Sequence, residues 1–357
     1  MKSTTLLAER FNASLDKIPA SIRESVNRRG GLSESKLLDL ILNPVDYSVN
    51  FPEVPGDNVV NQAYDVEACH SAGSLALSTG KVAYCIMAGG AGTRIGEPKA
   101  LLRIPEIGMS LLTLKIFQAE GTGPIWIIVS PQLKNRIIDH LYSQSGIDLK
   151  RIEFIEQYES YRLGPDNQIS FIDDKMPDLY PCGHGDLFAT IVNSGVLQKF
   201  YESGGEYISV VNVDNLAGSL DPIIIGRHIT AGANVSCEVV ERNLEDSGGV
   251  LCTVSGNQQI LETFKIRGTD IKLFNWLNTN SFVFNANLNI IPLGNCWNRV
   301  QKNINGKIVI QHERLLQEIT EAYDTQYLSV ERSSRFLPIK KQEDLKNVNP
   351  AYSLRLP

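Results

Sequence analysis

The stretch Val82–Lys99, with the sequence VAYCIMAGGAGTRIGEPK, decides how the rest of the chain is interpreted. Its apolar start, Val82–Met87, is short and rich in β-favouring residues, which predicts a buried strand. A glycine-rich loop follows and carries two cations, Arg94 and Lys99. Glycine lets a ligand approach the main chain, and backbone N–H groups beside cations suit phosphate oxygens. The loop therefore indicates a phosphate site, although a tight strand-to-helix turn is the plainer alternative.

Two familiar phosphate loops fail a test of spacing. The dinucleotide-binding fingerprint needs a third glycine at the position of Ile95. The kinase-type P-loop needs Gly-Lys-Ser/Thr, but Lys99 stands between Pro98 and Ala100. The pattern that remains is GGxGTRxGxPK.

Composition limits the classes of protein that need to be considered. The 357 residues suffice for one large domain or two, and a net charge of -6 argues against a nucleic-acid partner. The six cysteines form no CxxC pair, which predicts reduced thiols. The N-terminus is too charged for a secretory signal, and no run is apolar enough to span a bilayer. We therefore expect a cytoplasmic protein with no membrane partner.

The segment 1–80 is predicted to be a helical region followed by a connection. Ser3–Asp16 and Leu32–Leu42 have the spacing of amphipathic helices, and Ser33 is a suitable cap. Between residues 43 and 80, prolines and weak periodicity predict an extended connection with a short helix at Val66–Leu77.

From Val82 onwards, apolar strands alternate with helices. Helices are predicted at Leu133–Ser143, Asp186–Lys199 and Asp221–Ala231. Strands after the first are predicted at Ile125–Ser130, Ile152–Gln157, Tyr207–Val213, Val235–Val240, Val250–Val254 and Ser281–Asn285. Such alternation implies an α/β fold with a Rossmann-like mixed, mainly parallel sheet covered on both faces. We expect this catalytic domain over residues 81–345 and a tail over 346–357.

Ligands of such sheets bind at the carboxyl ends of the strands, where this chain places polar motifs. Asp214 ends the apolar strand in VNVDN, a position that suits a carboxylate holding Mg²⁺, although aspartate is also a common turn residue. The motif YPCGHGD ends at Asp186, and within it His184 offers a ring N–H to a phosphate. A lone histidine there would more simply flank a helix.

These motifs resemble those of the eukaryotic-type UTP–glucose-1-phosphate uridylyltransferase and UDP-N-acetylhexosamine pyrophosphorylase family. The family carries PPGHGDIY, NxDN, GG(T/V)L, FNTNN and RFLPVK, beside a similar glycine loop. The counterparts here are PCGHGDLF, NVDN, GGVL at Gly248–Leu251, LNTN at Leu277–Asn280 and RFLPIK at Arg335–Lys340. The resemblance runs from Val82 to Leu345 in six motifs in the right order, and it implies the sugar nucleotidyltransferase fold.

The resemblance also implies an activity and a set of site residues. A sugar-1-phosphate would attack the α-phosphorus of a nucleoside triphosphate and release pyrophosphate, with Mg²⁺ held by Asp214. The implied nucleotide-binding residues are Ala88, Gly89, Gly90, Gly92, Thr93, Gln157 and Gly183. The implied sugar-phosphate-binding residues are His184, Asn212, Gly249, Glu262, Asn278 and Asn280. The implied catalytic cations are Arg94, Lys99 and Lys340.

The sequence also departs from the family pattern. Cys182 replaces the second proline of PPGHGD, and Glu97 alone separates Gly96 from Pro98, a shorter loop than in the family. We expect no β-helix domain of the kind that follows RFLPVK in larger members, so oligomerisation through it is not implied.

Several functions remain as alternatives. UTP is the expected donor because Gln157 and GHGD match the uridylyltransferase branch, with glucose-1-phosphate or an analogue as acceptor. GTP or ATP with a modified sugar or cyclitol 1-phosphate is an alternative of the same class. A nucleotide-dependent oxidoreductase would need the fingerprint that fails at Ile95. A non-catalytic sugar-nucleotide sensor would not need Lys99, Asp214, His184 and Lys340 together.

Overall fold

The computed structural model describes residues 2–60, 62–90, 92, 96–119, 121–287, 296–304 and 306–348. Thr93 and Arg94 of the glycine loop therefore lie outside the described residues, as does most of the predicted tail.

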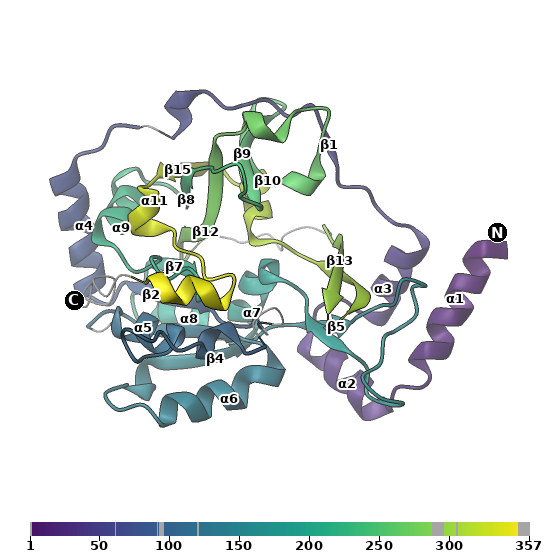
Figure 1. The fold of residues 1–357 in the computed structure, drawn as a ribbon. Coiled ribbons are helices and arrows are strands. Elements are labelled where there is room, and N and C mark those ends of the chain that lie inside the picture. The colour runs from purple at the N-terminus through teal and green to yellow at the C-terminus, as the bar shows by residue number, and fades with distance from the viewer. Residues whose placement is uncertain are drawn as a thin grey trace.

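Three helices open the chain: α1 (Lys2–Leu15), α2 (Ala20–Arg29) and α3 (Glu34–Leu42). Ser33 caps α3 as predicted, because its hydroxyl accepts the N–H of Lys36. Sequence reasoning missed α2, in which only Val26 is buried and no apolar stripe marks a helix. The three helices lie at one end of the molecule, next to β5 (Glu159–Tyr161) and β13 (Asn298–Ile304) (Figure 1).

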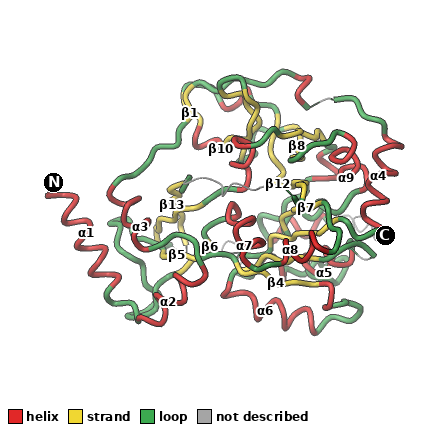
Figure 2. The backbone as a smooth tube through the Cα atoms, turned by 180° about the vertical axis from the view of Figure 1, so that it is seen from behind, coloured by secondary structure: helices red, strands yellow, loops and turns green. Residues whose placement is uncertain are grey.

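The predicted extended connection crosses the molecule from α3 to α4 (Val66–Ser78) (Figure 1). On the way β1 (Val49–Asn50) pairs in parallel with β11 (Ile266–Arg267). Helix α4 then packs against α9 (Pro222–Thr230), as both views show (Figures 1 and 2). The two helices approach closely because each has a glycine at the crossing: a Cβ on Gly73 would come within 2.7 Å of the Pro222 carbonyl carbon.

A nine-stranded sheet forms the centre of the molecule. Four neighbouring strands run parallel: β7 (Tyr207–Asn212), β2 (Val82–Met87), β3 (Ile125–Val129) and β4 (Ile152–Glu156). Beyond β7, the antiparallel β12 (Trp276–Asn285) joins this parallel region to β8 (Val235–Glu241), β9 (Gly249–Val254) and β10 (Asn257–Glu262), and β15 (Thr325–Ser329) adds to β8 in parallel. The predicted α/β class with a mixed, mainly parallel central sheet is confirmed.

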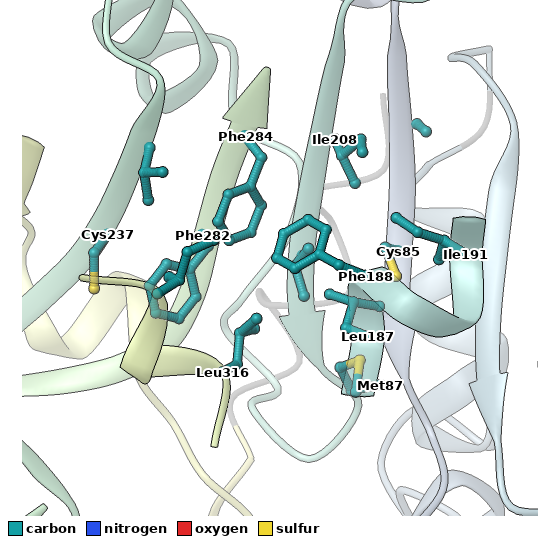
Figure 3. Packing of buried hydrophobic residues seen from close by; sticks show 14 of the residues in the cluster. Cys85, Met87, Leu187, Phe188, Ile191, Ile208, Cys237, Phe282, Phe284 and Leu316 are labelled. Carbon is teal, nitrogen blue, oxygen red and sulfur yellow. The ribbon is translucent and has the colours of Figure 1, made fainter. Parts of the chain in front are cut away.

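Apolar layers cover both faces of the parallel strands. On one face α5 (Leu111–Phe117) and α6 (Pro131–Tyr142) pack against Tyr84 and Ile86 of β2. On the other face α7 (Leu187–Asn193) and α8 (Val196–Glu202) pack against Cys85 and Met87. Figure 3 shows Phe188 of α7 between β7 and β12. Its ring meets Phe284 edge to face, with centroids 4.7 Å apart.

Two predicted elements differ in extent from the observed ones. The helix predicted at Asp186–Lys199 is split into α7 and α8, because Gly195 adopts a left-handed conformation with φ 76°. Asp186 precedes α7 but makes no capping hydrogen bond with its side chain, which instead forms a buried ion pair with Arg314. The strand predicted at Ser281–Asn285 begins earlier, at Trp276, so LNTN lies inside β12, where the pairing register with β8 shifts.

Two antiparallel pairs outside the central sheet were not predicted: β5 with β6 (Leu179–Pro181), and the hairpin of β13 with β14 (Lys307–Glu313). The helix α5 and the strands β1, β10, β11 and β15 were not predicted either. The other elements are short helical segments. They are η1 (Asp57–Val59), η2 (Lys99–Leu101), η3 (Leu149–Arg151), η4 (His184–Asp186), η5 (Thr263–Lys265), η6 (Ile271–Leu273), η7 (Leu316–Glu318), α10 (Ile319–Ala322), α11 (Arg332–Arg335) and η8 (Gln342–Asn347).

Candidate active site

Two adjoining cavities lie at the carboxyl ends of the central strands. The first has a volume of about 310 Å³ and is bordered by the ends of β2 and β7 and by the hairpin β13–β14. The second has a volume of about 200 Å³ and is bordered by β12 and by the segment that ends at Lys340. The two cavities share His184, Asn212 and Asp214. A ligand in either cavity therefore lies beside the same three side chains.

The first cavity collects the residues predicted to bind a nucleotide. The predicted residues that line it are Gly89, Gly90, Gly92, Lys99, Gln157 and Gly183. Ala88 does not line it: this side chain is fully buried, and the Ala88 N–H donates to the Ile128 carbonyl at 2.8 Å. Ala88 therefore supports the loop from beneath, and its predicted contact with a nucleotide stays a prediction.

Glycine is required in this cavity for steric reasons. A Cβ on Gly89 would overlap Oε1 of Gln157, whose Nε2 donates to the Gly183 carbonyl at 3.4 Å. Gly183 itself has φ 101° and lies against the main chain of Arg314. Gln157 thus joins the two glycine segments, and side chains at either glycine would separate them.

Charged residues in the first cavity lie close to residues of opposite charge. The Lys99 ammonium forms an ion pair with the Asp214 carboxylate, which joins the end of the glycine loop to the end of β7. Lys302 pairs with Glu313 across the hairpin β13–β14, with Nζ and Oε1 2.5 Å apart. Sequence reasoning missed Lys302 because this hairpin has few buried apolar residues to reveal its strands.

His184 presents a proton donor to both cavities. The Leu316 N–H donates to its Nδ1 at 2.8 Å, so Nδ1 carries no proton. Burial lowers the pKa of His184 to about 4, which keeps the ring neutral at pH 7. The proton of the neutral ring is therefore on Nε2, and a neutral N–H donor suits a phosphate oxygen.

The second cavity collects the residues predicted to bind the sugar phosphate. Asn280 has φ 59°, and its side-chain amide donates to Oδ1 of Asn212 at 3.0 Å. Its own N–H donates to Oδ1 of Asn278 at 2.8 Å. Oδ1 of Asn280 is buried without a hydrogen-bond partner among the described residues. It is therefore a ready acceptor for a ligand hydroxyl.

Glu262 and Gly249 line the same cavity. Burial raises the pKa of Glu262 to about 7, while Lys265 opposes the shift and Glu318 adds to it. Gln317 donates to Oε1 of Glu262 at 2.5 Å. A carboxyl group that retains a proton near neutral pH can both donate to and accept from a hydroxyl.

Lys340 is brought to the second cavity by the main chain around it. The Ile339 N–H donates to the Asp214 carbonyl at 2.8 Å, and Pro338 forms a bridge with Asn215. The last described segment therefore folds back against the end of β7. Lys340 then lines the second cavity together with His184 and Asp214.

The residues present fit a metal that arrives with phosphates. No cluster of three His, Cys, Asp or Glu side chains is found in the described part of the chain. Asp214 supplies a single carboxylate, whose Oδ2 faces Lys99. Mg²⁺ is commonly held by one or two carboxylates together with substrate phosphates and water. Asp214 is suited to that kind of site and not to a metal site built from protein ligands alone.

Comparison with known proteins identifies the family. The model of the UTP–glucose-1-phosphate uridylyltransferase family matches residues 50–353. The chain belongs to this family. The UTP–glucose-1-phosphate uridylyltransferase of Astragalus penduliflorus is 29% identical over 330 residues, which are 82% of this chain and 67% of that protein.

Solved structures share the fold. The UDP-N-acetylglucosamine pyrophosphorylase of Trypanosoma brucei is similar with a TM-score of 0.67 and 17% identity, over 97% of this chain and 84% of that one. UDP-glucose pyrophosphorylase of Leishmania major, solved with UDP-glucose, is similar with a TM-score of 0.66 and 18% identity, over 87% of this chain and 73% of that one.

Membership in the uridylyltransferase family confirms the predicted resemblance and the nucleotidyltransferase class. The roles of individual side chains stay predictions, as do the domain boundaries. The described part of the chain contains no helix with the length and apolar character needed to cross a membrane.

The state of the His184 ring can be measured directly. We expect ¹⁵N NMR of the protein to show a neutral ring at pH 6, with the proton on Nε2, because burial disfavours the imidazolium. The ring signals of His184 are assigned as those that disappear from the spectrum of the His184→Gln variant. A ring that is half protonated near pH 6.5, or one with the proton on Nδ1, would contradict the geometry.

Proposed function

We propose that this protein transfers the uridylyl group of UTP to glucose-1-phosphate, giving UDP-glucose and pyrophosphate. The observation that carries the proposal is the pair of adjoining cavities that share His184, Asn212 and Asp214. The first cavity has a glycine loop suited to a triphosphate, and the second has asparagines suited to hydroxyls. The names of the curated relatives support this assignment of the two substrates.

The reaction needs no protein nucleophile. A phosphate oxygen of the sugar-1-phosphate, already anionic at neutral pH, forms a bond to the α-phosphorus, and the bond from that phosphorus to the bridging oxygen of pyrophosphate breaks. The work of the protein is positioning and charge neutralisation. In this proposal Lys99 approaches the triphosphate from the first cavity, and Lys340 approaches the sugar phosphate from the second. The Nε2–H of His184 lies between them.

The metal has a defined place in the proposal. Mg²⁺, when bound, would neutralise phosphate charge beside the α-phosphorus. Asp214 would hold it, since this carboxylate lies where the two cavities meet. Asn280 and Glu262 would then recognise sugar hydroxyls through the unpaired Oδ1 and the buried carboxyl group. The expected cytoplasmic location stays a prediction.

A matrix of substrates tests the proposed function. Four nucleoside triphosphates are combined with a panel of sugar and cyclitol 1-phosphates, and released pyrophosphate is measured in the presence of Mg²⁺. We expect UTP to be the best donor and glucose-1-phosphate the best acceptor. If GTP or ATP gave the most pyrophosphate, the proposed type of reaction would stand, but the assignment of uracil as the base would be wrong. Tight nucleotide binding without pyrophosphate release would reject catalysis and favour a sensor.

Asp214→Asn tests the metal carboxylate. The amide keeps the size of the side chain and removes its charge, so we expect turnover to fall by at least about 100-fold, the scale of losing one charge-stabilising group. Steady-state rates over a range of Mg²⁺ concentrations measure the effect. Asp173→Asn, in an exposed turn, is the matched control and should keep full activity. Near-normal Mg²⁺-dependent turnover in Asp214→Asn would show that Asp214 does not hold the metal.

Lys340→Ala tests the cation of the second cavity. We expect a higher KM for the sugar phosphate and a lower kcat, because the ammonium would contact that phosphate. The backbone should not change, since Asp344 accepts the main-chain N–H groups of both Lys340 and Lys341. Lys341→Ala is therefore a matched control next to it in the chain. Equal kcat and KM values in Lys340→Ala and Lys341→Ala would show that Lys340 is a surface residue without a role in the reaction.

A further inference from the structure

Lys115 is a fully buried lysine in the apolar layer between α5 and the sheet. Its ammonium donates to the Asn215 carbonyl at 2.6 Å, to the Leu216 carbonyl at 3.3 Å and to the Gly218 carbonyl. All three acceptors belong to one turn, which directly follows Asp214. The three N–H groups of the ammonium thus match three carbonyls of a single loop.

None of these acceptors is a carboxylate, which distinguishes Lys115 from the other buried cations near it. Arg335 also holds this loop, through the Ser219 carbonyl at 3.1 Å, but its charge is matched by Glu238 at 2.6 Å. Burial lowers the pKa of the Lys115 ammonium to about 7, which shows that keeping its charge inside the protein is costly. Leucine and isoleucine fill much of the same layer without this cost. The position therefore indicates a task for Lys115 in fixing the turn.

The turn 215–218 connects the end of β7 to the segment that leads to Lys340. The Asn215 side chain donates to the Arg335 carbonyl at 3.0 Å and accepts the Leu337 N–H at 2.9 Å. The Leu216 N–H donates to the Leu337 carbonyl at 3.0 Å. This turn therefore directly follows Asp214 and holds the segment that leads to Lys340.

We propose that Lys115 is a positioning residue of the transfer reaction. It fixes the turn 215–218, and through that turn it holds Asp214 and Lys340 at fixed positions relative to each other in the two cavities. It touches neither substrate. The proposal rests on the proposed function for its effect on rate, while its effect on the backbone is independent of any substrate.

Lys115→Met tests this, because methionine has a similar length and no donor. We expect kcat/KM to fall by about 10- to 100-fold, the effect of a small misplacement of reacting groups, and the Mg²⁺ requirement to rise. In an Asp214→Asn background the same change should cost less than it does in the wild-type background, because the part of its effect that acts through the Asp214 carboxylate is already lost. Losses that multiply in the double variant would overturn the proposal.

Leu141→Ala is the matched control for general destabilisation. Leu141 lies on α6 in the same apolar layer and makes none of the hydrogen bonds of the turn. This variant should lose stability and keep its kcat/KM and Mg²⁺ requirement. If Leu141→Ala, compared at equal folded fraction, loses as much kcat/KM as Lys115→Met, the role of Lys115 is only structural.

Native-state hydrogen exchange gives a readout that needs no substrate. In Lys115→Met the amides of Leu216, Leu337 and Ile339 should exchange at least about 10-fold faster than in Leu141→Ala. Equal protection of these amides in the two variants would overturn the proposal for Lys115, whether or not the wild-type protein is active. An inactive wild-type protein would instead reject the proposed function. Should Lys115→Met fail to fold, Lys115→Gln, which retains an amide donor, should show the same selective exposure to a smaller degree.

Discussion

The site depends on the parallel pairing of β2 with β7, which places Met87 opposite Asn212. Both strands end at the same edge of the sheet, so the glycine loop and Asp214 meet although more than a hundred residues separate them. The Lys99–Asp214 ion pair then closes the gap between the two strand ends. The segment that leads to Lys340 is held at this edge by the main-chain hydrogen bond from Ile339 to Asp214 and by the packing of Ile339 and Leu337 in the apolar layer.

The sequence predicted the four neighbouring parallel strands of the central sheet. The strands β2, β3, β4 and β7 lie within one residue of their expected ends, because buried parallel strands appear as short apolar runs. The hairpin β13–β14 was missed because its strands mix polar and buried positions, and with it the ion pair between Lys302 and Glu313. Lys115 was missed because the short helix α5 was not predicted, and a single lysine in an apolar segment is ordinarily taken for a solvent-facing residue.

Site residues were found from sequence where a motif names them and missed where only the fold places them. Gly89, Gln157 and Asn280 line cavities as the motifs implied. The backbone and side-chain geometry of the site residues, however, could not be predicted from the sequence. The left-handed backbone of Asn280 arises where β12 changes register against β8, and the Nδ1 acceptor of His184 is set by an amide more than a hundred residues away. Tertiary contacts, not local sequence, determine which atom of each side chain faces the ligand.

The charge state of the site follows from the same contacts. Lys99, Arg162 and Lys302 line the first cavity, and each forms an ion pair with a carboxylate: Asp214, Asp178 and Glu313. The pairs limit the repulsion that three neighbouring cations would otherwise exert on one another. His184 and Glu262 are buried in a way that favours their neutral forms. In the proposed reaction a highly charged substrate would therefore meet a site of balanced charge, in which Lys99 would turn from Asp214 to a phosphate and leave the Asp214 carboxylate for a cation.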